Sequence, residues 1–522
     1  MRPLLAVTVS LALTVVACTD GREPSRPAQA GTAVPATEAT EASSEPAAEP
    51  AAWNATRQGT PGFLAVDYAP REGWDPGRPG ASRGALLPRD LRTGEELPGY
   101  RPVNVGQASH RFAWTPDRRY LAFVSTPGGP PANTGPRAES VRVVEGESWA
   151  EVTPPDLASL DGVVSFAWVP DGRSLLVFRN PGETPPGASQ SVEAWTVDVQ
   201  AGSRTLVTSG DFQTAGPPLV APDGDMAYAL GFRANQCCGI EVQGPPFVVA
   251  IDLSAGDMRE VALEDVAYGQ SQGRSQMPGL ALSPDGSRIF VAHPNDDLLT
   301  EVNLDRLEVA RTFQPRESRS ALSRLGAWLA GQFVSRAEAK GALYFRKDVA
   351  FSPDGRLLYV TGSHDEACPE AIGGACRSGV PFGLQVVDVE SGALLAWFED
   401  ISQFTQTPDG RYALGTGWTY EYTPGAERAE EIGHGLRVID THTLEVAYHV
   451  LPEGLLDGVV ASPDGAYAYV TARAPGYEAS MTSAGLCTEA CIHLHVVDLA
   501  DGEVVATRGI LSPFVALASL YP

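Results

Sequence analysis

One tetrapeptide recurs seven times in this chain of 522 residues and constrains its fold more than any other feature. Its second and third residues are always proline and aspartate, and its fourth is glycine in six of the seven copies, which suits a type I turn. Runs of β-forming residues flank the turns, as at 349–351 and 357–360. Each copy therefore predicts a β-hairpin. The copies begin at Thr115, Val169, Ala221, Ser283, Ser352, Thr407 and Ser462.

A second unit follows each hairpin and predicts two more strands. It appears at 384–388, 436–440 and 494–498, where apolar residues alternate with polar ones before an aspartate and a turn. Alternation with a period of two indicates a strand with one buried face. Four antiparallel strands per repeat make a β-propeller blade, so we predict an all-β fold of four-stranded antiparallel blades.

The repeats are longer than the roughly 40–45 residues that are common for four-stranded propeller repeats. Most of the excess lies between the second and third strands of each blade. A further insertion spans 315–346, where Leu322, Leu325, Leu329 and Phe333 recur at helical spacing. We expect one helical insertion there, packed over the edge of a blade or available for docking a partner.

The number of blades follows from counting both units. There are seven hairpins but eight copies of the second unit, because an extra copy lies at 88–95. Candidate strands also lie at 63–66 and at 514–517, close to the two ends of the chain. We expect the N- and C-terminal strands to share one blade, which closes the ring and removes an open sheet edge. This gives eight blades; seven is the alternative if the N-terminal pieces pack outside the ring.

The repeats resemble the YVTN family of bacterial β-propeller repeats, which belongs to the WD40-like superfamily. The segments 349–361 and 459–471 are the best copies, and the third-strand Val-Val-Asp followed by glycine also fits. The resemblance covers most of 60–522, although the early blades are degenerate. It implies the propeller fold. It implies little about activity, because such propellers include surface proteins, metal-linked binders and lactonase-like enzymes.

The N-terminus predicts export and lipid anchoring. Residues 1–17 carry one positive charge and a short apolar stretch, which is typical of a secretory signal and too short to span a membrane. The stretch ends in Val-Val-Ala before Cys18 and resembles a bacterial lipobox; an ordinary signal peptide with a chance cysteine is the alternative. Residues 18–60 are rich in Ala, Pro and Glu and predict a disordered tether. We therefore expect a propeller over 61–522, anchored in the cell envelope and facing the periplasm or the exterior.

The charge balance limits the partners. The formal net charge is −26 at pH 7. Nucleic acid and anionic lipid headgroups need a basic face, so we expect no nucleic-acid partner. The expected membrane contact is the lipid on Cys18, and we expect a monomer with an unidentified protein or small-molecule ligand.

Six cysteines remain after Cys18, in three close pairs, and an exported protein meets an oxidising compartment. Cys368 with Cys376 and Cys487 with Cys491 predict short disulfide loops. Cys237 and Cys238 are adjacent, which ordinary disulfide geometry disfavours. A strained bridge, two free thiols and a redox role all remain open for that pair.

Two places offer candidate metal ligands. His364 and Asp365 lie in one long loop, and His493 and His495 alternate with Cys491 along one strand. The simpler interpretation is a solvated acidic loop in the first case and structural polar positions in the second. No cofactor is predicted, and a divalent metal at these residues is the alternative.

The function is expected on the face that carries the long loops and all the cysteine pairs, because binding groups usually lie on loops held by a rigid scaffold. The sequence favours a membrane-anchored binding or scaffold module that acts through this face. The alternative is a propeller enzyme, either a lactonase-like hydrolase or a cofactor-dependent oxidoreductase, with its site at the central channel. The sequence identifies no catalytic residue.

Overall fold

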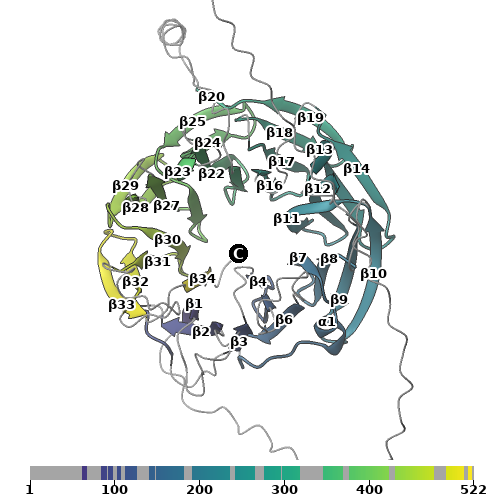
Figure 1. Ribbon diagram of the computed structural model, residues 1–522, viewed down its shortest axis with the longest axis horizontal. Coiled ribbons are helices and arrows are strands. Elements are labelled where there is room, and N and C mark those ends of the chain that lie inside the picture. The colour runs from purple at the N-terminus through teal and green to yellow at the C-terminus, as the bar shows by residue number, and fades with distance from the viewer. Residues whose placement is uncertain are drawn as a thin grey trace, which may run out of the picture. The chain divides into compact units, whose positions relative to one another are not determined.

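The computed structural model arranges the described residues as a ring of mainly antiparallel sheets around a central axis (Figure 1). Residues 53–522 form one unit, which contains all the described strands. The structure describes residues 61–67, 84–90, 92–97, 103–106, 112–125, 140–146, 148–181, 191–235, 241–264, 276–294, 297–317, 345–367, 375–421, 430–474, 490–510 and 515–519. The signal peptide, Cys18 and the tether lie outside these residues.

Seven sheets make up the described part of the ring. The first contains β1 (Pro61–Asp67), β2 (Gly84–Asp90), β3 (Val103–Gly106) and β34 (Val515–Ser519), and the second contains β4 (Phe112–Trp114), β5 (Tyr120–Ser125) and β6 (Ser140–Glu145). The third contains β7 (Val163–Trp168), β8 (Ser174–Arg179), β9 (Val192–Asp198) and β10 (Ser203–Gly210). The fourth contains β11 (Gln213–Val220), β12 (Met226–Asn235), β13 (Glu241–Asp252) and β14 (Met258–Ala262).

The fifth sheet contains β16 (Gly279–Leu282), β17 (Arg288–Ala292), β18 (Leu299–Asn303) and β19 (Glu308–Phe313). The sixth has eleven strands: β15 (Gln276–Met277), β20 (Arg316–Glu317), β21 (Phe345–Phe351), β22 (Leu357–Ala367), β23 (Ala375–Pro381), β24 (Leu384–Asp388), β25 (Ala393–Phe398), β26 (Gln403–Gln406), β27 (Tyr412–Glu421), β28 (Glu430–Asp440) and β29 (Glu445–Val450). The seventh contains β30 (Leu456–Ala461), β31 (Tyr467–Arg473), β32 (Ile492–Asp498) and β33 (Val504–Ile510).

The expectation of eight blades is therefore wrong, because the described strands form seven sheets. The difference arises at β23, which belongs to the long connection between β22 and β24. This strand pairs with β22 and also with β27, so the hairpins β21–β22 and β26–β27 belong to one sheet of eleven strands. Sequence spacing separates these two hairpins into different repeats, but it carries no information about a strand formed within the connection.

The first and last described strands do share one sheet, as predicted. Strand β34 pairs antiparallel with β1, from Phe63 opposite Ser519 to Asp67 opposite Val515. The order β3-β2-β1-β34 places the C-terminal strand at one edge of an otherwise N-terminal sheet. This pairing closes the ring through hydrogen bonds between residues more than 440 positions apart in sequence.

The predicted helical insertion mostly lies outside the described residues. Its described beginning, Arg316–Glu317, is strand β20, which pairs parallel with β25. Within the described part of the chain the one helix is the short α1 (Pro155–Ala158), between β6 and β7. No helix among the described residues is long and apolar enough to cross a membrane.

The recurring tetrapeptide forms a hydrogen-bonded turn between the first two strands of a blade. In the copy at Ser462, the hydroxyl donates to Asp464 Oδ1 at 2.6 Å and accepts from the backbone N–H of Tyr467 at 2.8 Å. Gly465 closes the turn with a φ of 70°, a conformation that glycine adopts without steric cost. The motif therefore specifies a tight connection.

The hydrophobic core is distributed around the ring. Alternate side chains of one strand pack on opposite sides of their sheet, as β8 illustrates. Leu175 and Val177 belong to a cluster with residues of β5 and β6, whereas Leu176 and Phe178 belong to a cluster with residues of β12 and β13. Each sheet thus contributes to two cores, which explains how a chain of this length folds without one large centre.

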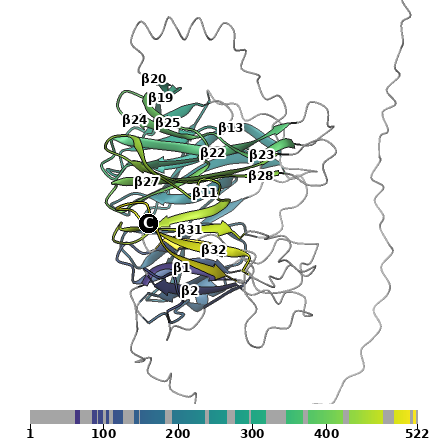
Figure 2. The same cartoon turned by 90° about the vertical axis from the view of Figure 1, so that its left-hand side faces the viewer.

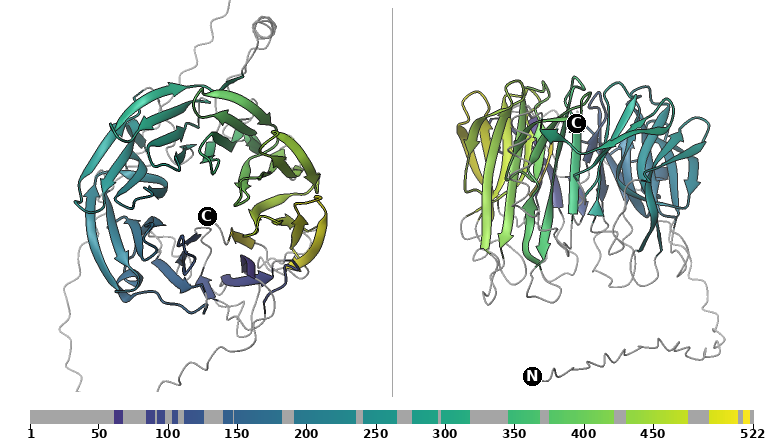
Figure 3. Two further views of the ribbon diagram at one scale, coloured as in Figure 1. Left: turned by 180° about the vertical axis from the view of Figure 1, so that it is seen from behind. Right: turned by 90° about the horizontal axis from the view of Figure 1, so that it is seen from above.

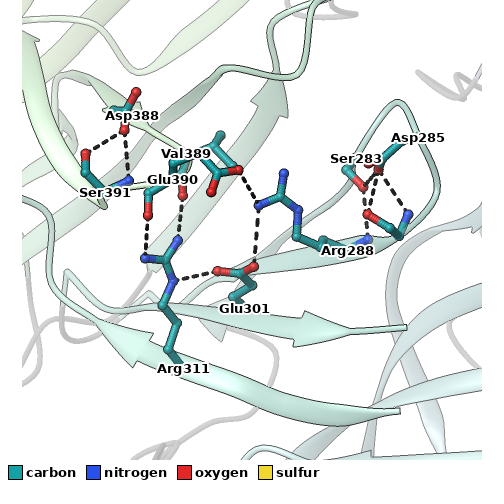
Figure 4. Close-up of polar contacts among 10 residues, drawn as sticks. Ser283, Asp285, Arg288, Glu301, Arg311, Asp388, Val389, Glu390 and Ser391 are labelled. Carbon is teal, nitrogen blue, oxygen red and sulfur yellow. Dashed lines mark hydrogen bonds and ion pairs between the residues drawn. The ribbon is translucent and has the colours of Figure 1, made fainter. Parts of the chain in front are cut away.

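A network of charges joins the fifth sheet to the turn between β24 and β25 (Figure 4). Glu301 of β18 accepts a hydrogen bond from Arg311 Nε at 2.5 Å, and its other oxygen lies 3.6 Å from Arg288. Arg311 also donates to the backbone carbonyls of Val389 and Glu390 in the turn between β24 and β25 of the sixth sheet. The side chain of Glu301 is 9% exposed, so this ion pair is largely shielded from water.

Two different faces of the ring follow from the strand directions. The Pro-Asp-Gly turns and the turns between third and fourth strands lie on one face. The other ends of the strands lead into the long second-to-third-strand connections and into the next sheet, and we call that side the loop face. Figure 2 shows β23 and β28 lying toward this side, and Figure 3 shows the sheets from behind and edge-on.

Candidate functional site

A pocket of about 250 Å³ opens on the loop face, where β23 joins β27. Its wall comes from the end of β23, the connection between β25 and β26, and the loop-face ends of β27 and β28. The residues that line it are Arg377, Val380, Pro381, Phe382, Gly383, Trp397, Glu399, Asp400, Thr419 and His434. None of them belongs to the innermost strands β21 and β26, so this pocket is not the channel site expected for the enzyme alternative.

His434 is held between a hydroxyl and a carboxylate. Its Nε2 lies 3.2 Å from Thr419 Oγ1, and its Nδ1 lies 4.0 Å from Asp400 Oδ1. Burial lowers the pKa of His434 below its ordinary value; the Asp400 carboxylate opposes this shift, while Arg437 and Arg377 reinforce it. The imidazole is therefore neutral at neutral pH, which is the form that accepts a proton.

Asp400 occupies an unusual backbone conformation beside His434. Its φ is 64°, in the left-handed region that non-glycine residues rarely adopt. A Cβ atom on Gly417 would lie 2.1 Å from the Asp400 carbonyl oxygen, so only glycine at that position lets the connection approach β27 so closely. Arg437 then donates to Asp400 Oδ2 at 3.1 Å. Such backbone conformations cluster at functional sites, where the surrounding structure holds them.

Trp397 forms the aromatic wall of the pocket. Its indole N–H donates to the Phe382 carbonyl oxygen at 3.1 Å, and the residue is 55% exposed. Gly383 has a φ of 81°, and a Cβ there would lie 2.2 Å from the indole nitrogen. The glycine thus allows the indole to lie against the backbone of 382–383, and the hydrogen bond fixes its orientation.

A buried lysine lies behind the pocket. Lys347 Nζ lies 3.8 Å from the centroid of the Phe382 ring and 3.1 Å from Asp297 Oδ1. Burial lowers the pKa of Lys347, and the Asp297 carboxylate opposes that shift. The ring of His364 also packs on Phe382, with the ring centroids 4.6 Å apart. These contacts fix Phe382, which lines the pocket.

The predicted metal-ligand candidates lie on strands of two different sheets. His364, on β22, contacts Phe382, while the side chain of Asp365 lies outside the described residues. His493 and His495 lie on β32 with their rings 5.9 Å apart in an edge-to-face arrangement. His495 Nδ1 lies 2.9 Å from Thr507 Oγ1, and burial lowers the pKa of this histidine to about 4. Among the described residues no three His, Cys, Asp or Glu side chains gather as a metal site would require.

The cysteine pairs are described only in part. Cys491 is fully buried and disulfide-bonded, but Cys487, its expected partner, lies outside the described residues. Cys376 belongs to β23, and Cys368 lies outside the described residues, as do Cys237 and Cys238. The three pairings therefore stay predictions.

Sequence reasoning did not identify the residues that line this pocket. Thr419 and His434 lie on the paired strands β27 and β28, and Asp400 lies just before β26, which also pairs with β27. The only local signal is the Gly-His-Gly sequence at 433–435, because glycines on both sides of a polar residue indicate close backbone approach.

Comparison with known proteins adds little to this geometry. No protein-family model and no curated protein sequence matches the chain. Solved structures that match include a dihydro-heme d1 dehydrogenase (13% identity, covering 88% of this chain and 75% of that one, TM-score 0.45) and the periplasmic gluconolactonase of Pseudomonas aeruginosa (16%, 73% and 99%, TM-score 0.38). An oligogalacturonate lyase in complex with manganese also matches (13%, 75% and 90%, TM-score 0.40). Structural similarity at these sequence identities and TM-scores says nothing about activity. The propeller assignment rests on the strand pairing.

Proposed function

We propose that the protein is a propeller enzyme that hydrolyses a small cyclic ester in the loop-face pocket. The observation that carries the proposal is the placement of His434 between the Thr419 hydroxyl and the Asp400 carboxylate in an open pocket. A neutral histidine with an adjacent carboxylate is a common general base. The separation of 4.0 Å to Asp400 is long for a hydrogen bond, but such contacts often tighten only when substrate binds.

The residues of the pocket suit a simple proton transfer. A water molecule attacks the ester carbonyl carbon and gives its proton to Thr419 Oγ1, while the Thr419 hydroxyl proton moves to His434 Nε2. Asp400 faces Nδ1 and stabilises the imidazolium that results. The carbon–oxygen bond of the ring then breaks, and the departing oxygen takes a proton back from His434. The product is an open hydroxy acid, and no external oxidant or reductant is needed.

The direct test is hydrolysis of a panel of five- and six-membered lactones, followed by acid release at constant pH. The full-length protein is compared with His434→Asn and Thr419→Val, and Thr419→Ser restores the hydroxyl. We expect a loss of at least about 100-fold in kcat for the first two variants and recovery in the third. His442→Asn, an exposed histidine on the turn side of β28–β29, is the matched control. Binding of lactones without any turnover would contradict the enzyme proposal and favour a binding module.

We also propose that the propeller is exported and held at the membrane through lipid on Cys18. The support is the sequence alone: the short apolar stretch before Cys18 and the tether that follows. Expression in a bacterium followed by membrane fractionation and mass spectrometry of the N-terminal peptide tests this. We expect diacylglyceryl modification and membrane association, and loss of both in Cys18→Ser. A soluble wild-type protein that retains residues 1–17 would contradict the proposal.

A further inference from the structure

Trp397 differs from the other large apolar residues of the described surface. The exposed large apolar side chains are otherwise aliphatic, on β10, β25, β29 and β33. Trp397 is the one aromatic residue among them, and it also lines the pocket. An aromatic ring left half in water at the wall of a pocket contributes contact area to whatever binds there.

The orientation of this indole is built into the fold. The N–H group is already occupied by the Phe382 carbonyl, and Gly383 leaves the space that a Cβ would fill. The ring therefore binds a ligand through its face and edge carbons rather than through its polar atom. A fixed ring loses little conformational entropy on binding, which favours a ligand with a flat apolar side.

The groups around the ring select among such ligands. Glu399 and Asp400 follow Trp397 closely in sequence and line the same pocket, so carboxylates that accept hydrogen bonds lie on one side. The guanidinium of Arg377 adds N–H donors. A neutral molecule with several hydroxyl groups uses both kinds of partner. A quaternary ammonium ligand would also stack on Trp397, but it gains nothing from the guanidinium of Arg377.

We propose that Trp397 is the stacking platform for a sugar-type ring, so that the cyclic ester hydrolysed by His434 is carbohydrate-derived. The inference rests on the proposed function for the reaction, but the stacking subsite stands on Trp397 and Gly383 alone. One face of a pyranose-sized ring presents C–H groups to the indole, and its hydroxyl groups reach Glu399 and Arg377.

Isothermal titration calorimetry of the full-length protein carrying His434→Asn tests the subsite without turnover of the lactone probes. The probes are a six-membered sugar lactone, the methyl glycoside of the same sugar, a lactone of equal ring size without hydroxyl groups, and choline. We expect the two sugar probes to bind, the plain lactone to bind at least about tenfold more weakly, and Trp397→Ala to weaken sugar binding about tenfold. Trp397→Phe should recover part of the loss.

Trp195→Phe is the matched control, because Trp195 lies on β9 of a different sheet and donates its N–H to Glu193. It should leave sugar binding unchanged. Equal binding of the plain and the sugar lactones, unchanged binding by Trp397→Ala, or a preference for choline would each overturn the inference. Loss of turnover in His434→Asn with sugar binding unaffected by Trp397→Ala would refute the subsite and keep the enzyme. Sugar binding that depends on Trp397, with no turnover of any lactone, would refute the enzyme and keep the subsite.

Discussion

Replacing Glu301 by glutamine should destabilise the ring far more than the same change at Glu390. Both carboxylates contact Arg288, at 3.6 Å and 3.2 Å, so distance alone predicts similar effects. Their surroundings differ, because the Glu301 side chain is 9% exposed and that of Glu390 is 84% exposed. Glu301 also holds Arg311, which reaches the backbone of the neighbouring blade repeat.

The magnitude follows from that burial. Removing one partner of a buried ion pair typically costs about 3–5 kcal/mol, since the remaining charge loses its compensation. The two arginine side chains are 22% and 33% exposed and regain some hydration, which lowers our expectation for Glu301→Gln to about 2–3 kcal/mol. Exposed pairs contribute about 0–1 kcal/mol, so Glu390→Gln should cost less than about 0.5 kcal/mol.

Urea unfolding followed by both tryptophan fluorescence and circular dichroism measures the difference. Two probes are needed because a large ring need not unfold in a single step. Glu301→Gln should unfold at clearly lower urea than the wild type, and Glu390→Gln should be nearly superimposable on it. Equal free energies of unfolding for the two variants would refute the claim that burial makes this network stabilising.

Three further predictions concern the pocket and the histidines. The acid limb of kcat/KM should lie below pH 6.5, because burial lowers the pKa of His434. Asp400→Asn should move that limb to still lower pH, because it removes the charge that raises the pKa of His434. A pH–rate profile checks both. Gly383→Ala should displace the indole of Trp397, because the new Cβ would lie 2.2 Å from it, and should weaken sugar binding at least about tenfold in a titration with the methyl glycoside. His495 has a pKa of about 4 in the folded state and 6.5 in the unfolded state, so the unfolded state binds the extra proton between these values. The stability of the wild type therefore falls as the pH drops from 6.5 toward 4. His495→Gln should lose less stability over that range, as measured by urea titrations at both pH values.

The propeller could be predicted from the sequence because its repeated turns are formed by residues that are close together in the sequence. A Pro-Asp-Gly turn needs only neighbouring residues, such as Ser462 and Asp464, to form its hydrogen bonds. The pairing of the terminal strands was also predictable, since an unpaired edge strand at each end of a repeat array needs a partner. The blade count was not, because β23 forms inside a connection whose spacing resembles an irregular loop.

The site was harder to predict for the same physical reason. His434 and Asp400 lie 34 residues apart, and their approach depends on the pairing of β27 with both β26 and β28 and on the absence of a side chain at Gly417. Periodicity identifies which residues are buried, but it does not report which connections approach one another. The position of the Trp397 indole likewise depends on the absence of a side chain at Gly383, a contact that the sequence does not report.

The proposed role of His434 in the loop-face pocket is that of general base in a hydrolytic reaction. The most direct measurement is the rate of acid release from a six-membered sugar lactone by the wild-type protein and by His434→Asn, with Kd for the matching methyl glycoside measured on both. We expect turnover by the wild type, a loss of at least about 100-fold in the variant, and similar glycoside binding by the two proteins. Equal rates for the two proteins, or no lactone hydrolysis by either, would contradict it.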